Sequence, residues 1–372
     1  MSYDVAVIGT GNPDQSDGYA MAYRHARGYQ RLPDCELIAC ADVIEDNAVA
    51  FAETFDIEET SVYEEYEAML AAESPDIVSV CTPSKTHAEI VEGCANSGVL
   101  EAIHCEKPMA ATWKGCRKMV QVCDRAGVQL TFNHQRRFAA PYRKAKSMVA
   151  AGRIGELERI EVGGSNLYDY GTHLFDMCGY VTDQTPIEWV LGQVDYTDTN
   201  VQYGLYQESE ALARWQYKSG IDGFASTGEN GLVDCEIRLV GTTGTIEIGS
   251  SGSPPLRIRT GSGWASVDTG RDGVWRVQPH PIDRVLNRFS FGPDRLLSDP
   301  PYVARAIADI VAALRDGSES ELAAKNALQT TELVFACWES ARRGGRVKLP
   351  IYVEENPLEA MVARGRVDSS TE

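Results

Sequence analysis

Residues 3–12 read YDVAVIGTGN, a short hydrophobic segment that ends in a glycine-rich turn. Four consecutive hydrophobic residues precede the turn, as in a parallel strand that is buried on both faces. Glycines let the backbone approach a pyrophosphate closely, and a helix that starts after the turn favours the negative charge at its N-terminus. The stretch therefore predicts the first βα unit of a nucleotide-binding domain, with phosphate contacts from Gly9, Thr10, Gly11 and Asn12.

The spacing of the glycines departs from the usual Gly-x-Gly-x-x-Gly pattern. The third glycine would fall at Asp14, and the next glycine in the chain is Gly18. We therefore expect an insertion, Pro13–Asp17, in the phosphate loop. An acidic side chain there is unfavourable beside a pyrophosphate unless it points away from it.

Strand and helix signals alternate from this turn to about residue 135. Strands are expected at Asp4–Gly9, Glu36–Ala41, Ile77–Cys81, Glu101–Cys105 and Gln129–Phe132. Helices are expected at Tyr19–Gln30, Asp46–Thr54, Glu64–Ala72, His87–Asn96 and Trp113–Arg125. Repeated βα units with right-handed crossovers form a doubly wound parallel sheet of the Rossmann type. Residues 1–135 are thus expected to form an α/β nucleotide-binding domain.

The pattern changes in residues 136–350, which we expect to form a second, α+β domain. A helix at Pro141–Ala151, a strand at Glu158–Val162 and a short helix carrying Asp169 and His173 are expected first. Four strands then follow without intervening helices, which is typical of an open, mostly antiparallel sheet. They are Ala211–Tyr217, Gly223–Thr227, Val233–Val240 and Thr245–Ile248, followed by helices at Tyr302–Arg315 and Leu322–Arg342. Residues 351–372 form an acidic tail that we expect to be partly disordered.

Asp42 ends the second predicted strand. A carboxylate at this place can accept hydrogen bonds from the hydroxyl groups of an adenosine ribose. No arginine or lysine follows within several residues to receive a 2′-phosphate, so NAD is favoured over NADP. The alternative is that Asp42 only caps the helix that begins near Asp46.

The strand at Ile77–Cys81 ends near the middle of the predicted sheet. Ligands of doubly wound sheets bind beyond the carboxyl ends of the strands. Thr82, Pro83 and His87 are therefore candidates to line the cofactor groove. For His87, a role in capping the following helix is an equally good interpretation.

Glu106-Lys107-Pro108 follows the next strand and lies at the same edge of the sheet. Pro108 favours an extended backbone at Lys107, which projects the lysine into the crevice. The ammonium group can bind a substrate hydroxyl and stabilise developing alkoxide charge. Glu106 is a candidate to pair with Lys107 or to hold a cofactor ribose, and the alternative for Lys107 is a surface lysine before a turn.

Asp169 and His173 are four residues apart and would share one face of a helix. An imidazole can take the proton of an alcohol as a hydride leaves the carbon. Such a pair is also common as a purely structural contact, but its place after a nucleotide-binding half favours catalysis. We therefore expect Lys107, His173 and Asp169 to be catalytic, with Asp169 orienting the substrate or supporting His173 in an interdomain cleft.

The composition limits the classes of partner. The chain of 372 residues has a formal charge of −19, and only 9 of its 35 cationic residues are lysines. Acid excess with few lysines is typical of a halophilic protein, since concentrated salt screens self-repulsion, although an ordinary acidic enzyme is the alternative. A nucleic-acid or membrane-surface partner is disfavoured because phosphate groups require a basic face.

Ten cysteines occur without Cys-x-x-Cys spacing or a histidine pair at ligand spacing, so we expect reduced core residues and no metal site. Hydrophobic runs stay well short of the roughly 18 residues that cross a membrane. The N-terminus lacks a basic region and leads directly into a strand. We therefore expect a cytoplasmic protein.

Taken together, the motifs resemble the Gfo/Idh/MocA oxidoreductases, which include glucose–fructose oxidoreductase and inositol dehydrogenase. The resemblance covers most of the chain and rests on Gly9-Thr10-Gly11, residues 81–89, Glu106 to Ala110, residues 133–138, Gly152 to Gly155, residues 169–176, and residues 339–350. It implies an NAD(P)-binding domain and a C-terminal domain whose large sheet forms dimers or tetramers. It also implies that Lys107, Asp169 and His173 are the substrate-binding and catalytic set, and that Asn133 and Arg136 or Arg137 contact the substrate.

The resulting hypothesis is an NAD-dependent dehydrogenase that acts on a CH–OH group of a sugar, polyol or cyclitol. Two alternatives share the fold: an NAD-retaining enzyme that cleaves glycosidic bonds, and a non-catalytic sensor of NAD and sugar. The segment before Asp169 is shorter than the glycine-rich loop of many family members, so the resemblance does not extend to a particular substrate.

Overall fold

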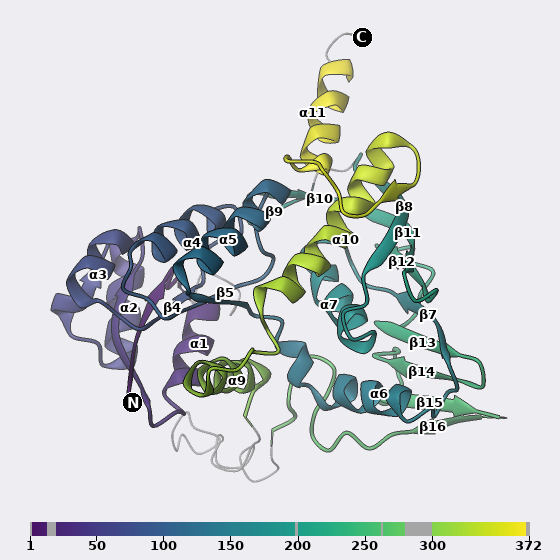
Figure 1. Cartoon of the computed structure of the whole chain (residues 1–372), viewed down its shortest axis with the longest axis horizontal. Helices are drawn as coiled ribbons and strands as arrows, with labels where there is room; N and C mark the ends of the chain where they lie inside the picture. The colour runs from purple at the N-terminus through teal and green to yellow at the C-terminus, as the bar shows by residue number, and fades with distance from the viewer. Residues whose placement is uncertain (1, 13–19, 198–199, 262, 280–299, 370–372) are drawn as a thin grey trace.

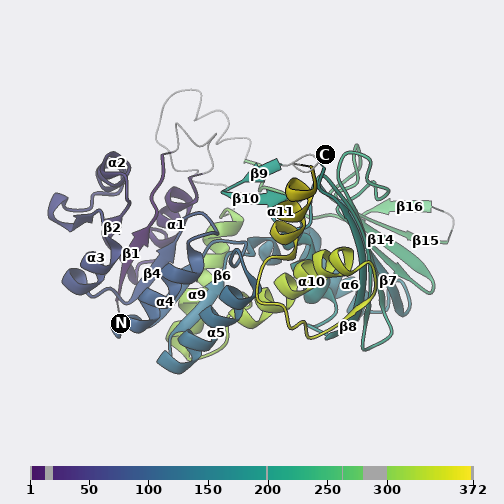
Figure 2. The same ribbon diagram turned by 90° about the horizontal axis from the view of Figure 1, so that it is seen from above.

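The computed structural model describes residues 2–12, 20–197, 200–261, 263–279 and 300–369. Its first part is a six-stranded parallel sheet in the order β3-β2-β1-β4-β5-β6, with helices on both faces (Figures 1 and 2). The strands are β1 (Tyr3–Ile8), β2 (Cys35–Ala41), β3 (Val62–Tyr63), β4 (Ile77–Val80), β5 (Ala102–Cys105) and β6 (Gln129–Phe132). The helices are α1 (Met21–Tyr29), α2 (Glu45–Phe55), α3 (Tyr66–Glu73), α4 (His87–Asn96) and α5 (Trp113–Ala126), with a short 3-10 helix at Glu59–Ser61. The predicted doubly wound class is confirmed, and only the two-residue β3 was missed.

The second part is built on a nine-stranded sheet in the order β16-β15-β14-β13-β7-β12-β11-β8-β17. Its strands are β7 (Leu157–Val162), β8 (Ile187–Asp195), β11 (Glu210–Tyr217), β12 (Asp222–Thr227), β13 (Ile237–Gly241), β14 (Gly244–Ile248), β15 (Leu256–Thr260), β16 (Gly263–Ser266) and β17 (Val347–Lys348). The described strand pairs of this sheet are antiparallel except β7–β12, which confirms a large and mostly antiparallel sheet. A small hairpin, β9 (Asn200–Gln202) and β10 (Leu205–Gln207), lies outside it.

Helices cover one face of the large sheet and fill the space toward the first domain (Figure 2). They are a 3-10 helix at Gln135–Phe138, α6 (Ala140–Ala150), α7 (Gly171–Val181), α9 (Tyr302–Asp316), α10 (Ala324–Arg343) and α11 (Pro357–Ser369). Helix α9 packs on α1 of the first domain, where a Cβ at Gly28 would lie 2.5 Å from Ile307 Cδ1. The C-terminal part of the chain thus returns to pack on the nucleotide-binding domain.

No helix in the described ranges is long and apolar enough to cross a membrane.

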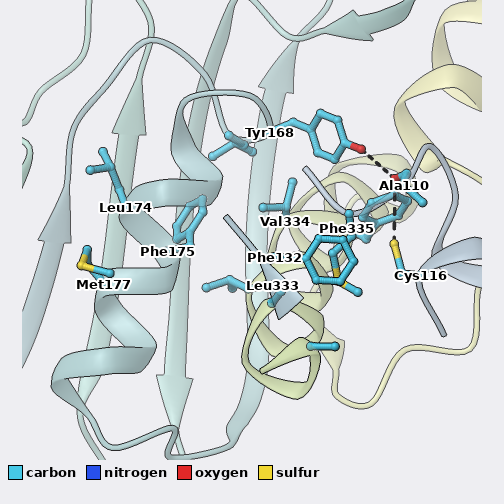
Figure 3. Packing of buried hydrophobic residues seen from close by; sticks show 14 of the residues in the cluster. Ala110, Cys116, Phe132, Tyr168, Leu174, Phe175, Met177, Leu333, Val334 and Phe335 are labelled. Atoms are coloured by element: carbon cyan, nitrogen blue, oxygen red, sulfur yellow. Dashed lines mark hydrogen bonds between the residues drawn. The ribbon is translucent and has the colours of Figure 1, made fainter. Parts of the chain in front are cut away.

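A continuous hydrophobic core joins the two halves of the chain (Figure 3). Phe132 from β6, Phe335 from α10 and Tyr168 from the turn before α7 are all buried in it. The hydroxyl of Tyr168 donates a 2.7 Å hydrogen bond to the carbonyl oxygen of Ala110, which belongs to the first domain. The residue before Asp169 is therefore anchored to the nucleotide-binding half.

Two predictions of local structure are wrong. Asp169 does not lie on a helix, because α7 begins at Gly171 and side-chain hydrogen bonds hold the preceding residues in a turn; Asn166 Oδ1, for example, accepts from the Tyr170 amide. The described part of the tail carries a helix that was not predicted, α11, in which Leu358 is buried and Asn356 accepts hydrogen bonds from the first amides; residues 370–372 lie outside the described residues. The strand expected from Val233 begins only at Ile237.

Glu208, in the link between β10 and β11, is a buried carboxyl group that holds the same turn. Its Oε1 accepts from the Leu167 amide, and its Oε2 accepts from the Trp338 indole at 2.8 Å. Burial raises the pKa of Glu208 to about 7, although both hydrogen bonds oppose the rise. The folded state therefore favours the protonated form of the Glu208 carboxyl group.

The contribution of protonated Glu208 to the free energy of unfolding is fully present below the ordinary carboxyl pKa of 4.5 and is lost as the pH rises through about 7. The rise in the Glu208 pKa corresponds to a contribution of roughly 3 kcal/mol to the free energy of unfolding. We expect the advantage of the wild type over Glu208→Gln in free energy of unfolding to shrink by up to that amount between about pH 5 and about pH 8. Urea unfolding of both proteins across this range measures it. A difference that is independent of pH would contradict the assignment.

Candidate active site

The carboxyl ends of β1, β2 and β4 meet around Gly9. Its φ is +81°, and a Cβ there would lie 2.5 Å from Thr82 Cγ2, so glycine is required for this close approach. Asp42 accepts from the Gly11 amide at 2.9 Å and from the Thr10 hydroxyl at 3.1 Å. The predicted phosphate turn and the predicted ribose carboxylate therefore lie side by side.

These residues fit a nicotinamide dinucleotide. Gly11 also has a positive φ, of +60°, and nothing described lies within 4 Å of the position of its Cβ, which leaves open space at the turn. Asp42 also accepts from the Ile44 amide at 3.0 Å in a local turn, but α2 begins at Glu45 after the N-cap residue Ile44 and has no side-chain cap, so the alternative of a capping role is not observed. The insertion Pro13–Asp17 lies outside the described residues.

The turn after β4 gives a mixed result for the predicted groove residues. Thr82 and Pro83 are partly or fully exposed, as a groove lining requires, but His87 is completely buried. Its Nε2 lies 2.7 Å from the Thr82 carbonyl oxygen and its Nδ1 lies 3.0 Å from that of Pro108. The interpretation of His87 as a groove residue is therefore wrong: it joins the turns after β4 and β5.

Glu106 takes part in a buried polar network. Its Oε1 lies 2.9 Å from His25 Nε2 and accepts a 2.6 Å hydrogen bond from Nδ2 of the Asn133 side chain. Burial alone would raise the pKa of Glu106, but His25, Asn133 and the charge of Lys107 together lower it to about 2. Glu106 does not pair with the Lys107 side chain, and it reaches that residue only through the backbone amide at 3.2 Å.

Lys107 crosses from the first domain to the turn before α7. Its Nζ donates to Asp169 Oδ1 at 2.8 Å and to the Asp169 carbonyl oxygen at 3.0 Å. Both side chains retain 18% exposure, so the pair is reachable by a small molecule. The structure thus brings together two of the three predicted catalytic residues, which lie 62 positions apart in the sequence.

His173, on the first turn of α7, completes the set. Burial lowers its pKa well below the ordinary value of 6.5, and the positive charges of Arg136 and Lys107 lower it further. Its Nδ1 is buried without a partner among the described residues. His173 is therefore a neutral imidazole close to the Lys107 ammonium group, able to accept a proton.

The two predicted substrate arginines have different roles. Arg137 forms two hydrogen bonds with Asp176, at 2.7 and 2.6 Å, and this buried pair joins α7 to the 3-10 helix. Arg136 donates to Glu236 at 2.8 Å, but its Nη2 is buried without a partner in the described part of the chain. Arg136 therefore remains a candidate for substrate contact, whereas Arg137 is structural. Asn133 is fully buried and holds Glu106 through Nδ2, while its Oδ1 has no partner in the described part of the chain, so it also remains a candidate.

Sequence reasoning missed several residues of this site. They are His25, His134, Tyr170, Glu236 and Trp275. Each comes from a different element, and no spacing in the sequence joins them. Two of them lie inside stretches that carry the resemblance: His134 stands between Asn133 and Arg136, and Tyr170 directly follows Asp169.

Known proteins match this arrangement along the chain. Residues 3–134 match the model of the Gfo/Idh/MocA family described as an oxidoreductase family with an NAD-binding Rossmann fold, and residues 158–349 match its C-terminal alpha/beta domain. A D-apiose dehydrogenase of Paraburkholderia graminis is 24% identical over 92% of this chain and 91% of its own. An inositol 2-dehydrogenase of Rhizobium meliloti is 25% identical over 64% of this chain and 76% of its own. A D-xylose 1-dehydrogenase [NADP(+)] of Haloarcula marismortui is 25% identical over 73% of this chain and 80% of its own.

Solved structures confirm the fold. An oxidoreductase from Agrobacterium radiobacter in complex with NAD⁺, L-tartaric acid and magnesium superposes with a TM-score of 0.73 and 19% identity, over 97% of this chain and 100% of the other. The WlbA dehydrogenase from Bordetella pertussis, in complex with NADH and UDP-GlcNAcA, gives a TM-score of 0.71 and 20% identity, over 95% and 100% of the two chains. Because both family models match consecutive parts that together span most of the sequence, the chain belongs to the Gfo/Idh/MocA family of NAD-binding oxidoreductases.

Proposed function

We propose that this protein is a dehydrogenase that oxidises a CH–OH group of a sugar, polyol or cyclitol with NAD, or reduces the corresponding carbonyl group. One observation carries the proposal. The Lys107 ammonium group pairs with Asp169 at the nucleotide edge of the first domain, and its positive charge helps to lower the pKa of His173, which follows Asp169 by four residues. Such a pair can bind an alcohol oxygen and remove its proton.

The residues act in a defined order. Lys107 donates a hydrogen bond to the substrate hydroxyl and stabilises the negative charge that develops on its oxygen. A ring nitrogen of His173 accepts the hydroxyl proton, while Asp169 holds Lys107 in place. NAD supplies the acceptor of the hydride that leaves the carbinol carbon. Gly9, Gly11, Asp42 and Thr82 would hold this cofactor, and Glu106 would support Lys107 from the buried network.

The relatives support this class of reaction, since those named above are dehydrogenases of apiose, inositol and xylose. They do not agree on the cofactor, because the xylose enzyme is named for NADP(+). We favour NAD for this chain because Asp42 ends β2 with a carboxylate, which would repel a 2′-phosphate.

We also propose that copies associate through the outer face of the nine-stranded sheet. Leu191 on β8 and Leu212 on β11 are 48% and 46% exposed there, although both strands have a neighbouring strand on either side. The acidic composition supports work in concentrated salt, and the ten free cysteines support a reducing compartment such as the cytoplasm.

Replacing Lys107 tests the proposal. We expect Lys107→Ala to lower kcat/KM for the oxidation of myo-inositol or D-xylose by at least about 100-fold, because the charge at the developing alkoxide is lost. NAD affinity, measured by calorimetry, should change little. Lys114→Ala is the matched control, since its side chain is exposed and pairs only with Glu354 on the surface. Near-normal formation of NADH by Lys107→Ala would sink the assignment.

The pH profile tests the role of His173. Its lowered pKa keeps the imidazole neutral at acid pH, so kcat/KM for oxidation should stay level as the pH falls through 6.5 and decline only well below it. Assays that return each sample to neutral pH separate titration from unfolding. An acid limb centred at or above 6.5 would contradict His173 as the base in this environment.

Replacing Asp42 tests the cofactor preference. Asp42→Ser should weaken NAD binding and raise the ratio of NADP to NAD in kcat/KM by roughly tenfold or more, because a carboxylate that repels a 2′-phosphate is removed. Asp46→Ser, on the first turn of α2, is the control for a general effect of charge. An unchanged ratio in Asp42→Ser would show that Asp42 serves only the local turn.

A further inference from the structure

His25 is a buried polar residue that the proposed reaction leaves without a role. It lies on α1, the helix that follows the phosphate turn, and its side chain is 0% exposed. A side chain without exposed surface touches neither cofactor nor substrate. Any effect of His25 on the reaction must therefore pass through the residues that surround it.

Both ring nitrogens of His25 contact polar side chains. Nε2 lies 2.9 Å from Glu106 Oε1, while Nδ1 lies 3.1 Å from Ser79 Oγ on β4 and 3.6 Å from Cys81 Sγ. The Ser79 hydroxyl oxygen lies 3.1 Å from that of Tyr29, which is one helical turn beyond His25 on α1. The imidazole thus joins the inner face of α1 to the carboxyl ends of β4 and β5.

The Glu106 carboxylate is held at both of its oxygen atoms. Although burial opposes the change, hydrogen bonding to His25 and Asn133 lowers the pKa of Glu106 to about 2, so the group is ionised and can only accept. Nε2 of His25 and Nδ2 of Asn133 therefore both donate to Oε1, and these nitrogens lie 3.2 Å apart. Oε2 accepts from the Lys107 backbone amide at 3.2 Å. Because a carboxylate is planar and rigid, the donors on Oε1 also determine where Oε2 holds the Lys107 amide.

Lys107 depends on this carboxylate because no regular element holds it. β5 ends at Cys105, and the Lys107 side chain reaches Asp169 in the turn of the other domain at 2.8 Å. The Asp169 contact holds the ammonium end of the side chain, and the Glu106 contact holds the backbone end. A displacement of the backbone is passed on to Nζ, and an error of about 1 Å at a reacting group can lower a rate by about 100-fold.

We propose that His25 is a positioning residue: through the Glu106 carboxylate it sets the place of the Lys107 backbone and thereby of the Lys107 ammonium group. This inference rests on the proposed dehydrogenase function. It gives α1 a second task, because the helix at the nucleotide turn then also supports the lysine of the reacting site. The contact that carries this role is that of Nε2 with Glu106, whereas the contact of Nδ1 with Ser79 serves the fold.

Two amide variants separate these contacts. The side-chain nitrogen of glutamine can occupy the place of Nε2 and that of asparagine the place of Nδ1, so each variant keeps one contact. We expect His25→Asn to lower kcat for the oxidation of myo-inositol or D-xylose by about 10- to 100-fold, with KM changed by less than about threefold. His25→Gln should keep kcat within about threefold of the wild type, because its amide still donates to Glu106. Equal kcat values in the two variants would overturn the proposal.

Tyr29→Phe is the control for a loss of stability. It removes the hydroxyl group that contacts Ser79 and leaves His25 in contact with Glu106. Its melting temperature should fall, while kcat stays within about twofold of the wild type. A fall in kcat as large as that of His25→Asn would show that the network serves only the stability of the domain, and would overturn the proposal.

The position of Lys107 can be followed without turnover. Only nine lysines occur in the chain, so reductive methylation with ¹³C-labelled formaldehyde gives few NMR signals, and Lys107→Arg identifies that of Lys107. This signal should shift in His25→Asn and stay in place in His25→Gln and Tyr29→Phe. An unshifted signal in His25→Asn would overturn the positioning role.

Should His25→Asn fail to fold, Glu106→Gln provides the comparison, because an amide group cannot accept at both of its positions. The same shift of the Lys107 signal is expected in this variant, and its absence overturns the proposal. If no sugar or polyol yields NADH with the wild type although NAD binds, the dehydrogenase function is overturned. The NMR comparison still decides the role of His25 in that case.

Discussion

The ion pair between Lys107 and Asp169 is the interaction on which the rest of the site depends. It joins the edge of a parallel sheet to a turn of the other domain, over a Nζ–Oδ1 distance of 2.8 Å. Neither side chain is held by a regular element, because Lys107 follows β5 and Asp169 precedes α7. Each must therefore be fixed by its neighbours if the pair is to have one geometry.

Separate sets of buried residues provide that support. On the side of Lys107, Glu106 is held by His25 from α1 and by Asn133 after β6, so α1 is connected to the Lys107 backbone through hydrogen bonds. On the side of Asp169, Tyr168 and Glu208 fix the turn to the first domain and to α10. Buried polar groups of this kind cost free energy when they lose one partner. These groups fix the positions of Lys107 and Asp169 in the site, in addition to stabilising the fold.

The sequence predicted the parts that follow from local rules. Continuous hydrophobic strands between helices identified the doubly wound sheet, and Lys107, Asp169 and His173 were found because they follow motifs at strand and turn positions. The turn at Asp169 was mistaken for a helix, since the hydrogen bond from Leu167 to Glu208 spans 41 residues and leaves no periodic signal. His87 and Glu106 were assigned to the cofactor groove from their order along the chain, and only the packing shows that both side chains point into the interior. Trp275 could not be identified from the sequence, because Arg136 and Tyr170, which it contacts, lie on distant parts of the chain.

A crystal structure with NADH and the best substrate tests the central claim most directly. The account predicts that the substrate hydroxyl oxygen lies about 3 Å from both Lys107 Nζ and a ring nitrogen of His173, with Asp169 still in contact with the lysine. A substrate that binds in the cleft with its hydroxyl groups away from Lys107, or with His173 hydrogen-bonded elsewhere, would contradict it.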